Sequence, residues 1–133
     1  MHETLHILGF DESLYGDYLA SDGNLHTDML EQVTLHANRS PNYLLKTPNV
    51  VAWTQEHFGC GTIAGIPLEN EDGGIKGSHW ERLAMYDELM TGTALGPQKS
   101  FSALTFAMLK DMGWYEVDDS FNDTTNYGFN KGC

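Results

Sequence analysis

Residues that share one helical face recur at intervals of three and four in two stretches of this 133-residue chain, and most of them are apolar. In the first stretch, Val50, Trp53 and His57 fall on one helical face, shortly after Thr47-Pro48. Threonine is a common N-cap, and proline is favoured at the first helical position because its missing N–H costs nothing there. The pattern therefore predicts a helix near residues 48–58 that ends at Gly59.

The second stretch follows Pro97, where Ser100 can cap a helix over residues 100–113 that ends at Gly113. Its apolar positions are spaced by three and four along one face: Phe101, Leu104, Met108 and Met112. Because an apolar stripe of this width normally faces the interior, we expect this helix to belong to the core.

Two short β-prone runs, Val33 to Leu35 and Tyr43 to Leu45, flank a turn at Ser40-Pro41-Asn42 and could pair as a hairpin. Three other segments lack periodicity and are rich in Gly, Asn, Asp and Ser, which is typical of loops: residues 10–24, 61–78 and 114–133. The predicted fold class is α+β, mainly helices and long loops around a small core.

The first residues of the chain carry a candidate metal site, His2-Glu3-Thr4-Leu5-His6, on a helix that Gly9 can end. Positions i and i+4 lie one turn apart on the same face, so His2 and His6 can offer two imidazole nitrogens to one metal ion. Glu3 lies one step round the helix, where its carboxylate can reach a metal-bound water as a general base. This spacing is typical of zinc peptidases.

A catalytic zinc site uses three protein ligands, so a third must come from elsewhere in the chain. The third residue after Gly9 is Glu12, not the histidine that completes a short H-E-x-x-H-x-x-G-x-x-H motif. Four further histidines are candidates: His26, His36, His57 and His79.

The surroundings of these four histidines differ. His57 falls in a predicted helix beside an apolar residue and is expected to be a packing residue, while His26 and His36 are expected to be solvated loop residues. His79 stands apart because Asp87-Glu88-Leu89-Met90 follows it after a short interval.

Composition and charge exclude several classes of protein. With 41% apolar residues the chain can fold as one domain, and a net charge of −12 disfavours binding to nucleic acid. The longest mainly apolar run, Phe101 to Met112, contains Lys110 and Asp111 and is too short to cross a bilayer.

Two cysteines, Cys60 and Cys133, can form a disulfide or remain free thiols, and their spacing does not decide between these states. The sequons at Asn38 and Asn122 favour an oxidising, secretory setting. We expect no signal peptide within this chain, because the candidate metal helix begins at its second residue, and we expect the chain to be a piece of a longer protein.

Several sequence blocks follow one another along the chain: His57-Phe58-Gly59-Cys60, Gly77-Ser78-His79-Trp80, Asp87-Glu88-Leu89-Met90, Ser102-Ala103-Leu104-Thr105 and Asp111-Met112-Gly113-Trp114-Tyr115. In this order they resemble the leishmanolysin (M8) family of metallopeptidases. The resemblance covers almost the whole chain and is strongest from Thr47 to Tyr115. In that family a long insertion separates the glycine of the motif from the third zinc histidine.

The resemblance implies a metzincin-like catalytic subdomain, truncated at its N-terminus, that holds one Zn²⁺. It implies zinc ligands His2, His6 and His79, with Glu3 as general base. Gly9 would form the turn after the motif, and Met90 would be the methionine of the Met-turn beneath the imidazoles, although plain core packing of Met90 is an alternative. A disulfide between Cys60 and Cys133 is implied as well. The corresponding segments are a zinc-binding helix at 1–9, an insertion at 10–76, the third ligand and Met-turn at 77–92, a helix at 100–113 and a tail at 114–133.

The implied activity is zinc-dependent endopeptidase hydrolysis of peptide or protein substrates by a zinc-activated water, with Glu3 as general base. The implied location is secreted or at the cell surface, with membrane association only through parts outside this chain. The alternative is a non-catalytic fragment or pseudo-peptidase that acts as a cell-surface adhesion or binding module.

Overall fold

A computed structural model describes residues 1–34, 40–71, 73–93 and 99–133 of the chain. Within these residues, three α-helices and a three-stranded antiparallel sheet confirm the predicted α+β class. The elements, in order, are α1 (His2–Ile7), the 3₁₀ helix η1 (Glu12–Asp17), β1 (Leu30–Val33), β2 (Asn42–Leu45), α2 (Pro48–Phe58), β3 (Ile66–Pro67), α3 (Ala103–Asp111) and the 3₁₀ helix η2 (Asp119–Phe121).

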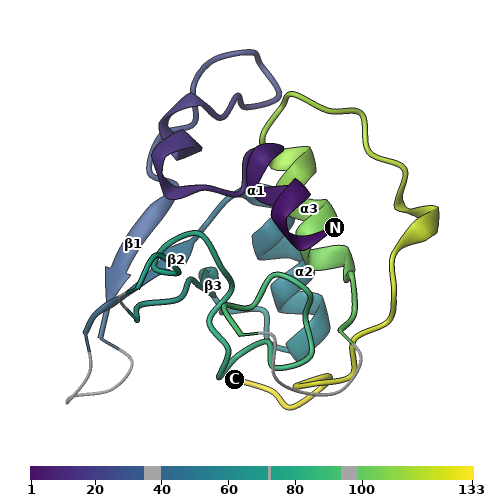
Figure 1. Cartoon of the computed structure of the whole chain (residues 1–133). Coiled ribbons are helices and arrows are strands. Elements are labelled where there is room, and N and C mark those ends of the chain that lie inside the picture. Colours follow the sequence, from purple (N-terminus) through teal and green to yellow (C-terminus); the bar gives the residue numbers. More distant parts are fainter. Residues whose placement is uncertain (35–39, 72, 94–98) are drawn as a thin grey trace.

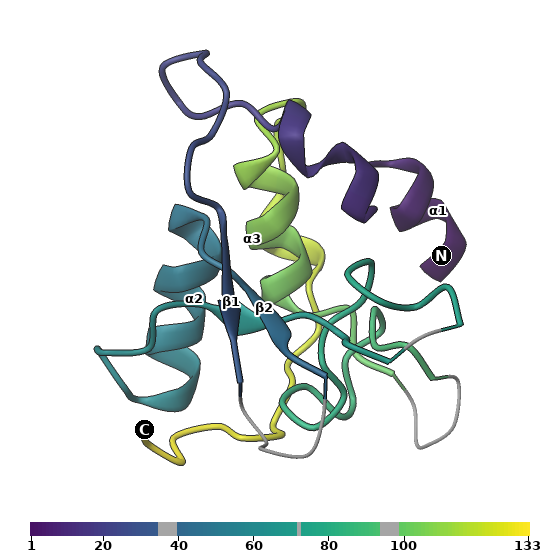
Figure 2. The same ribbon diagram turned by 90° about the vertical axis from the view of Figure 1, so that its left-hand side faces the viewer.

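The elements are layered around α3. Figures 1 and 2 show α2 and α3 side by side, with the sheet on one side of them and the C-terminal tail on the other. Helix α1 lies near α3, on the opposite side from α2 (Figure 2). None of the helices in the described part of the chain is long and apolar enough to cross a membrane.

Helix α3 forms the centre of the core, as its apolar stripe predicts. The side chains of Leu104, Met108 and Met112 are fully buried, and the helix ends before Gly113, whose φ is +69°. The predicted start at Ser100 is wrong, because Ser102 occupies the N-cap position.

The later start of α3 has a tertiary cause. Residues 100–102 are extended, because the backbone N–H of Leu89 donates to the Ser100 carbonyl and that of Asp123 donates to the Phe101 carbonyl, both at 2.8 Å. These contacts with distant segments replace the first turn that the local sequence would allow.

Helix α2 begins at Pro48 and ends before Gly59 (φ +67°), as predicted. Thr47 takes the N-cap position but makes no capping hydrogen bond with its side chain. The cap comes instead from Asp111, at the end of α3, whose carboxylate accepts hydrogen bonds from the backbone N–H groups of Asn49 at 3.1 Å and Val50 at 3.0 Å.

The predicted hairpin forms, but its first strand lies earlier than expected. Strand β1 spans Leu30–Val33, and its register pairs Leu30 with Leu45 and Val33 with Asn42. A third strand, β3, which the sequence did not predict, pairs with β2 through Ile66 and Leu45. The remainder of the predicted first run, at Leu35, lies outside the described residues, as does the sequon at Asn38.

The loop expected over residues 10–24 contains the unpredicted 3₁₀ helix η1, and the tail expected over 114–133 contains the short η2.

The turn after α1 requires a glycine at position 9, as the sequence predicted. Gly9 has φ +129°, and a Cβ there would lie 2.7 Å from the Trp114 ring and 2.9 Å from the Met112 sulfur. The chain therefore turns at Gly9 directly against the segment that follows α3.

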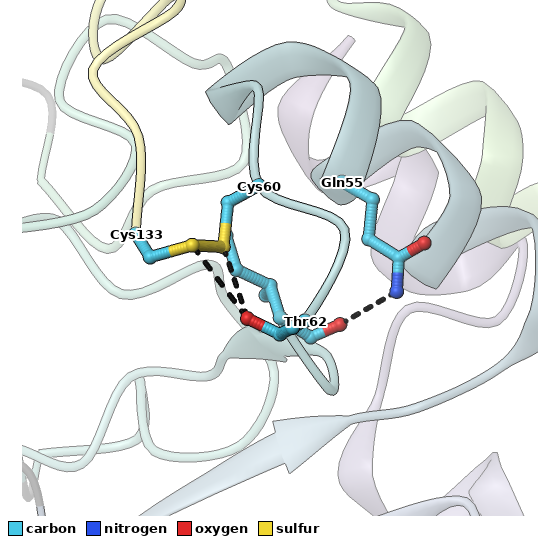
Figure 3. The surroundings of a disulfide bond; sticks show 5 residues. Gln55, Cys60, Thr62 and Cys133 are labelled. Atoms are coloured by element: carbon cyan, nitrogen blue, oxygen red, sulfur yellow. Dashed lines mark hydrogen bonds between the residues drawn. A yellow bond between two sulfur atoms is a disulfide. The ribbon is translucent and has the colours of Figure 1, made fainter.

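A disulfide joins Cys60, just after α2, to Cys133, in agreement with the family-based prediction. Figure 3 shows the bond beside Thr62, whose hydroxyl lies 3.4 Å from the Cys60 sulfur and 3.6 Å from the Cys133 sulfur. On the other side of the same turn, the Gln55 side chain donates to the Ile63 carbonyl at 2.9 Å. The bond therefore fixes the end of the tail to the end of α2.

Candidate metal centre

Helix α1 brings two of the predicted site residues together. His2 and His6 are one turn apart, and their Nε2 atoms lie 3.2 Å from each other. The third imidazole comes from a distant loop: Nε2 of His79 lies 3.1 Å from that of His2 and 3.2 Å from that of His6. Among the described residues, these three form the group of His, Cys, Asp or Glu side chains that could hold a metal ion.

The other ring nitrogen of each histidine contacts a backbone carbonyl. The Nδ1 of His2 donates to Leu89 O at 2.7 Å, that of His6 to Phe10 O at 2.8 Å and that of His79 to Ile75 O at 2.9 Å. A carbonyl oxygen only accepts, so the proton of each neutral ring sits on Nδ1.

This tautomer leaves three Nε2 lone pairs that face one another without a proton between them. Such an arrangement is repulsive unless a cation lies among the three atoms. Tetrahedral zinc with nitrogens at about 2.05 Å would hold them about 3.3 Å apart, close to the separations observed here. The donor set and its carbonyl partners therefore fit a zinc ion.

The loop that carries His79 is fixed by hydrogen bonds on both sides. The backbone N–H of Glu69 donates to the His79 carbonyl at 2.8 Å, and the Tyr15 hydroxyl donates to the Gly77 carbonyl at 2.6 Å. Ser78 Oγ accepts from the backbone N–H of Glu12 at 3.2 Å. Helix η1, the next element after α1, is thus hydrogen-bonded to the loop of the third histidine.

Electrostatics favours the neutral form of His79. Its side chain is 6% exposed, and burial, reinforced by the neighbouring His6 and His2, lowers its pKa despite the opposing hydrogen bond to Ile75. A neutral imidazole is the form that binds a metal.

Met90, which the family resemblance assigns to a Met-turn, lies in a turn of the chain that contacts the loop of His79. Its side chain is fully buried, and its carbonyl accepts from the Trp80 backbone N–H at 2.9 Å. Trp80 follows His79 directly, so the turn and the loop of the third histidine are hydrogen-bonded to each other.

A pocket of about 660 Å³ opens over the three imidazoles, and the exposed Glu3 lies in its wall. Several lining residues were not anticipated from the sequence, because nothing in their spacing links them to the motif. The pocket is lined by His2, Glu3, His6, Asp11, Gly74, Ile75, Ser78, His79, Leu89, Thr91, Gly92, Thr93 and Lys99.

Two of the remaining histidines, His57 and His26, lie away from the cluster. His57 is buried, stacks on Trp53 with ring centroids 4.4 Å apart and contacts the Tyr127 carbonyl at 2.8 Å, in agreement with a packing role. The prediction that His26 is solvated is wrong, because its half-buried ring contacts the Asp111 carbonyl at 2.9 Å. His36 lies outside the described residues.

Comparison with known proteins agrees with this geometry. The sequence model of the leishmanolysin peptidases, family M8, matches residues 1–133. The chain is 30% identical to a leishmanolysin-like peptidase of Drosophila melanogaster, with 99% of this chain and 24% of the relative aligned. It is 32% identical to the human ciliated left-right organizer metallopeptidase, with 99% of this chain and 17% of the relative aligned. It is 31% identical to leishmanolysin of Leishmania tropica, with 99% of this chain and 19% of the relative aligned. The chain thus spans about a quarter or less of the length of the relatives it matches.

Proposed function

The chain belongs to the leishmanolysin family of peptidases, and from this premise we propose that it is the zinc-binding part of a metalloendopeptidase catalytic region. The proposed ligands are His2, His6 and His79. The observation that carries the proposal is the convergence of their three Nε2 atoms within 3.1–3.2 Å, with each Nδ1 tied to a carbonyl.

Bound zinc would act as a Lewis acid and lower the pKa of a water molecule from about 16 to about 7. The carbonyls of Leu89, Phe10 and Ile75 keep the three rings in the tautomer that presents Nε2 to the metal. The rings therefore need no rearrangement before they coordinate the ion.

Glu3 is the proposed general base. It follows His2 on α1, its side chain is exposed, and it lines the same pocket as the three imidazoles. From this position its carboxylate can take a proton from the attacking water and return it to the amine that leaves.

We propose peptide or protein substrates and an extracellular or cell-surface location, since the family is one of peptidases and the chain carries the Cys60–Cys133 disulfide. The net charge of −12 disfavours an anionic polymer as ligand.

Zinc content tests the ligands. We expect about one zinc per purified wild-type chain. His79→Ala should lose most of it, whereas His26→Ala should retain it because His26 contacts a carbonyl outside the cluster. A wild type without zinc, or equal zinc in His79→Ala, would refute the metal site.

Glu3→Gln tests the general base separately. The variant should bind zinc like the wild type, because Glu3 is not a ligand, while its rate of peptide hydrolysis should fall by several orders of magnitude. Glu56→Gln, an exposed change on α2, is the matched control and should leave the rate unchanged. A Glu3→Gln protein that hydrolyses peptide at the wild-type rate would disprove the assigned role.

A further inference from the structure

We propose that Glu88 is a positioning residue whose buried carboxylate fastens the turn containing Leu89 and Met90 to the start of α3, and so fixes the geometry of the three imidazoles. The inference rests on the proposed metal site. It concerns a side chain that touches neither the pocket nor the histidines, but that contacts the segments that hold them.

Glu88 is fully buried, and hydrogen-bond donors reach both of its carboxylate oxygens. Its Oε1 accepts from the backbone N–H of Ser102 at 3.3 Å, from the Ser102 hydroxyl at 3.1 Å and from the Thr105 hydroxyl at 2.6 Å. Its Oε2 accepts from the backbone N–H of Met90. One carboxylate therefore bridges the turn and the first turn of α3.

Two short paths lead from this carboxylate to the imidazoles. Leu89, the next residue, supplies the carbonyl that accepts from His2 Nδ1 at 2.7 Å. Met90 supplies the carbonyl that accepts from the Trp80 backbone N–H at 2.9 Å, directly beside His79. A shift of this turn would therefore move two of the three proposed ligands.

Thr105 reinforces the second path. Its hydroxyl donates to Glu88 and accepts from Trp80 Nε1 at 3.0 Å. Helix α3, the most buried element of the fold, thus holds the turn through Glu88 and the loop of His79 through Trp80.

The donors around Glu88 suit a carboxylate, the form present at pH 8. All four hydrogen-bonding partners of the Glu88 side chain are donors, and a carboxylate can accept at both of its oxygens. A glutamine of the same size can satisfy the Ser102 and Thr105 donors with its single oxygen. Its NH₂ group would then face the N–H of Met90, donor against donor, so the variant releases the turn while it keeps the contacts to α3.

The test compares Glu88→Gln with Asp111→Asn, a matched control. Asp111 is also a buried carboxylate with three hydrogen bonds, but its partners are the first residues of α2. The zinc-free full chains are first melted to measure stability. Zinc affinity is then measured at pH 8 by competition with a chromophoric chelator, and the visible spectrum of the cobalt(II)-loaded protein reports the ligand geometry.

Both variants should melt below the wild type, but only Glu88→Gln should bind zinc about 10- to 100-fold more weakly and change the cobalt spectrum. Wild-type affinity and an unchanged spectrum in Glu88→Gln would overturn the inference and leave the proposed metal site standing. A wild type that binds no zinc would overturn both.

A second pair of variants decides the matter if Glu88→Gln does not fold. Thr105→Val removes the hydroxyl that joins Glu88 to Trp80, whereas Thr105→Ser retains it. We expect several-fold weaker zinc binding in Thr105→Val and restoration in Thr105→Ser. Equal affinities in the two variants would contradict the proposed path.

Discussion

Replacement of Asp111 by alanine tests whether one helix caps another in this fold. Asp111 is 4% exposed, and its carboxylate accepts three hydrogen bonds at the start of α2. The donors are the backbone N–H of Asn49 at 3.1 Å, the side-chain amide of Asn49 at 2.6 Å and the backbone N–H of Val50 at 3.0 Å. Thr47, the N-cap residue, makes no capping bond that could take over. Asp111→Ala would therefore leave the first N–H groups of a core helix without an acceptor.

The expected cost follows from these contacts. Loss of an N-cap costs about 0.5–2 kcal/mol, and loss of a negative charge at a partly buried helix N-terminus costs up to about 2 kcal/mol more. We expect the unfolding free energy to fall by about 3 kcal/mol in total, out of roughly 5–15 kcal/mol for a domain. The melting temperature should drop by roughly 10 °C.

Urea denaturation of the disulfide-bonded protein, followed by far-ultraviolet circular dichroism, measures this loss. Asp111→Asn keeps one oxygen acceptor and should lie between alanine and the wild type. Asp118→Asn is the control on an exposed cap, since Asp118 accepts from Ser120 N at the start of η2, and it should have little effect. A loss below about 1 kcal/mol in Asp111→Ala would show that α2 does not depend on this cap.

Two further predictions concern the disulfide and a buried acid. Reduction of the Cys60–Cys133 bond, which closes a sequence separation of 73 residues, should lower the unfolding free energy by about 4 kcal/mol by the chain-entropy estimate. A double Cys→Ser variant should be insensitive to the reductant, and an equal response from it would contradict this assignment. Burial raises the pKa of Glu88 from 4.5 to about 7, so the folded protein binds a proton that the unfolded chain has already released. This contribution to stability is present in full below about pH 4.5 and is lost by about pH 7. Between these pH values, denaturation should show the unfolding free energy of the wild type falling by up to about 3 kcal/mol relative to that of Glu88→Gln. Parallel pH dependence of the two unfolding free energies would refute the prediction.

Helices α1 and α2 could be predicted from the sequence because their determinants are local. The spacing of His2 and His6 fixes their relation as soon as the segment is helical, and proline and glycine set the ends of α2 through their own backbone preferences. The hairpin could also be predicted, but its first strand lies earlier than the sequence indicates, since several neighbouring residues suit a strand equally well.

The long-range features of the candidate site depended on tertiary structure or on resemblance. His79 stood out only by its neighbours along the chain and by the family pattern. The fold brings its Nε2 atom to 3.1 Å from that of His2, which is 77 residues away in the sequence. Nothing in the local sequence indicates that Asp111 caps α2, or that Glu88 accepts four hydrogen bonds.

The sequence alone determined the helical periodicity, most of the helix ends and the types of side chain available for a metal. Only the tertiary structure decided which distant groups meet, where α3 begins, and which carboxylates are buried. The physical reason is that local preferences act between residues a few positions apart. Contacts such as those of His79, Asp111 and Glu88 require the closure of long loops, and only the packing of the whole core repays that entropy.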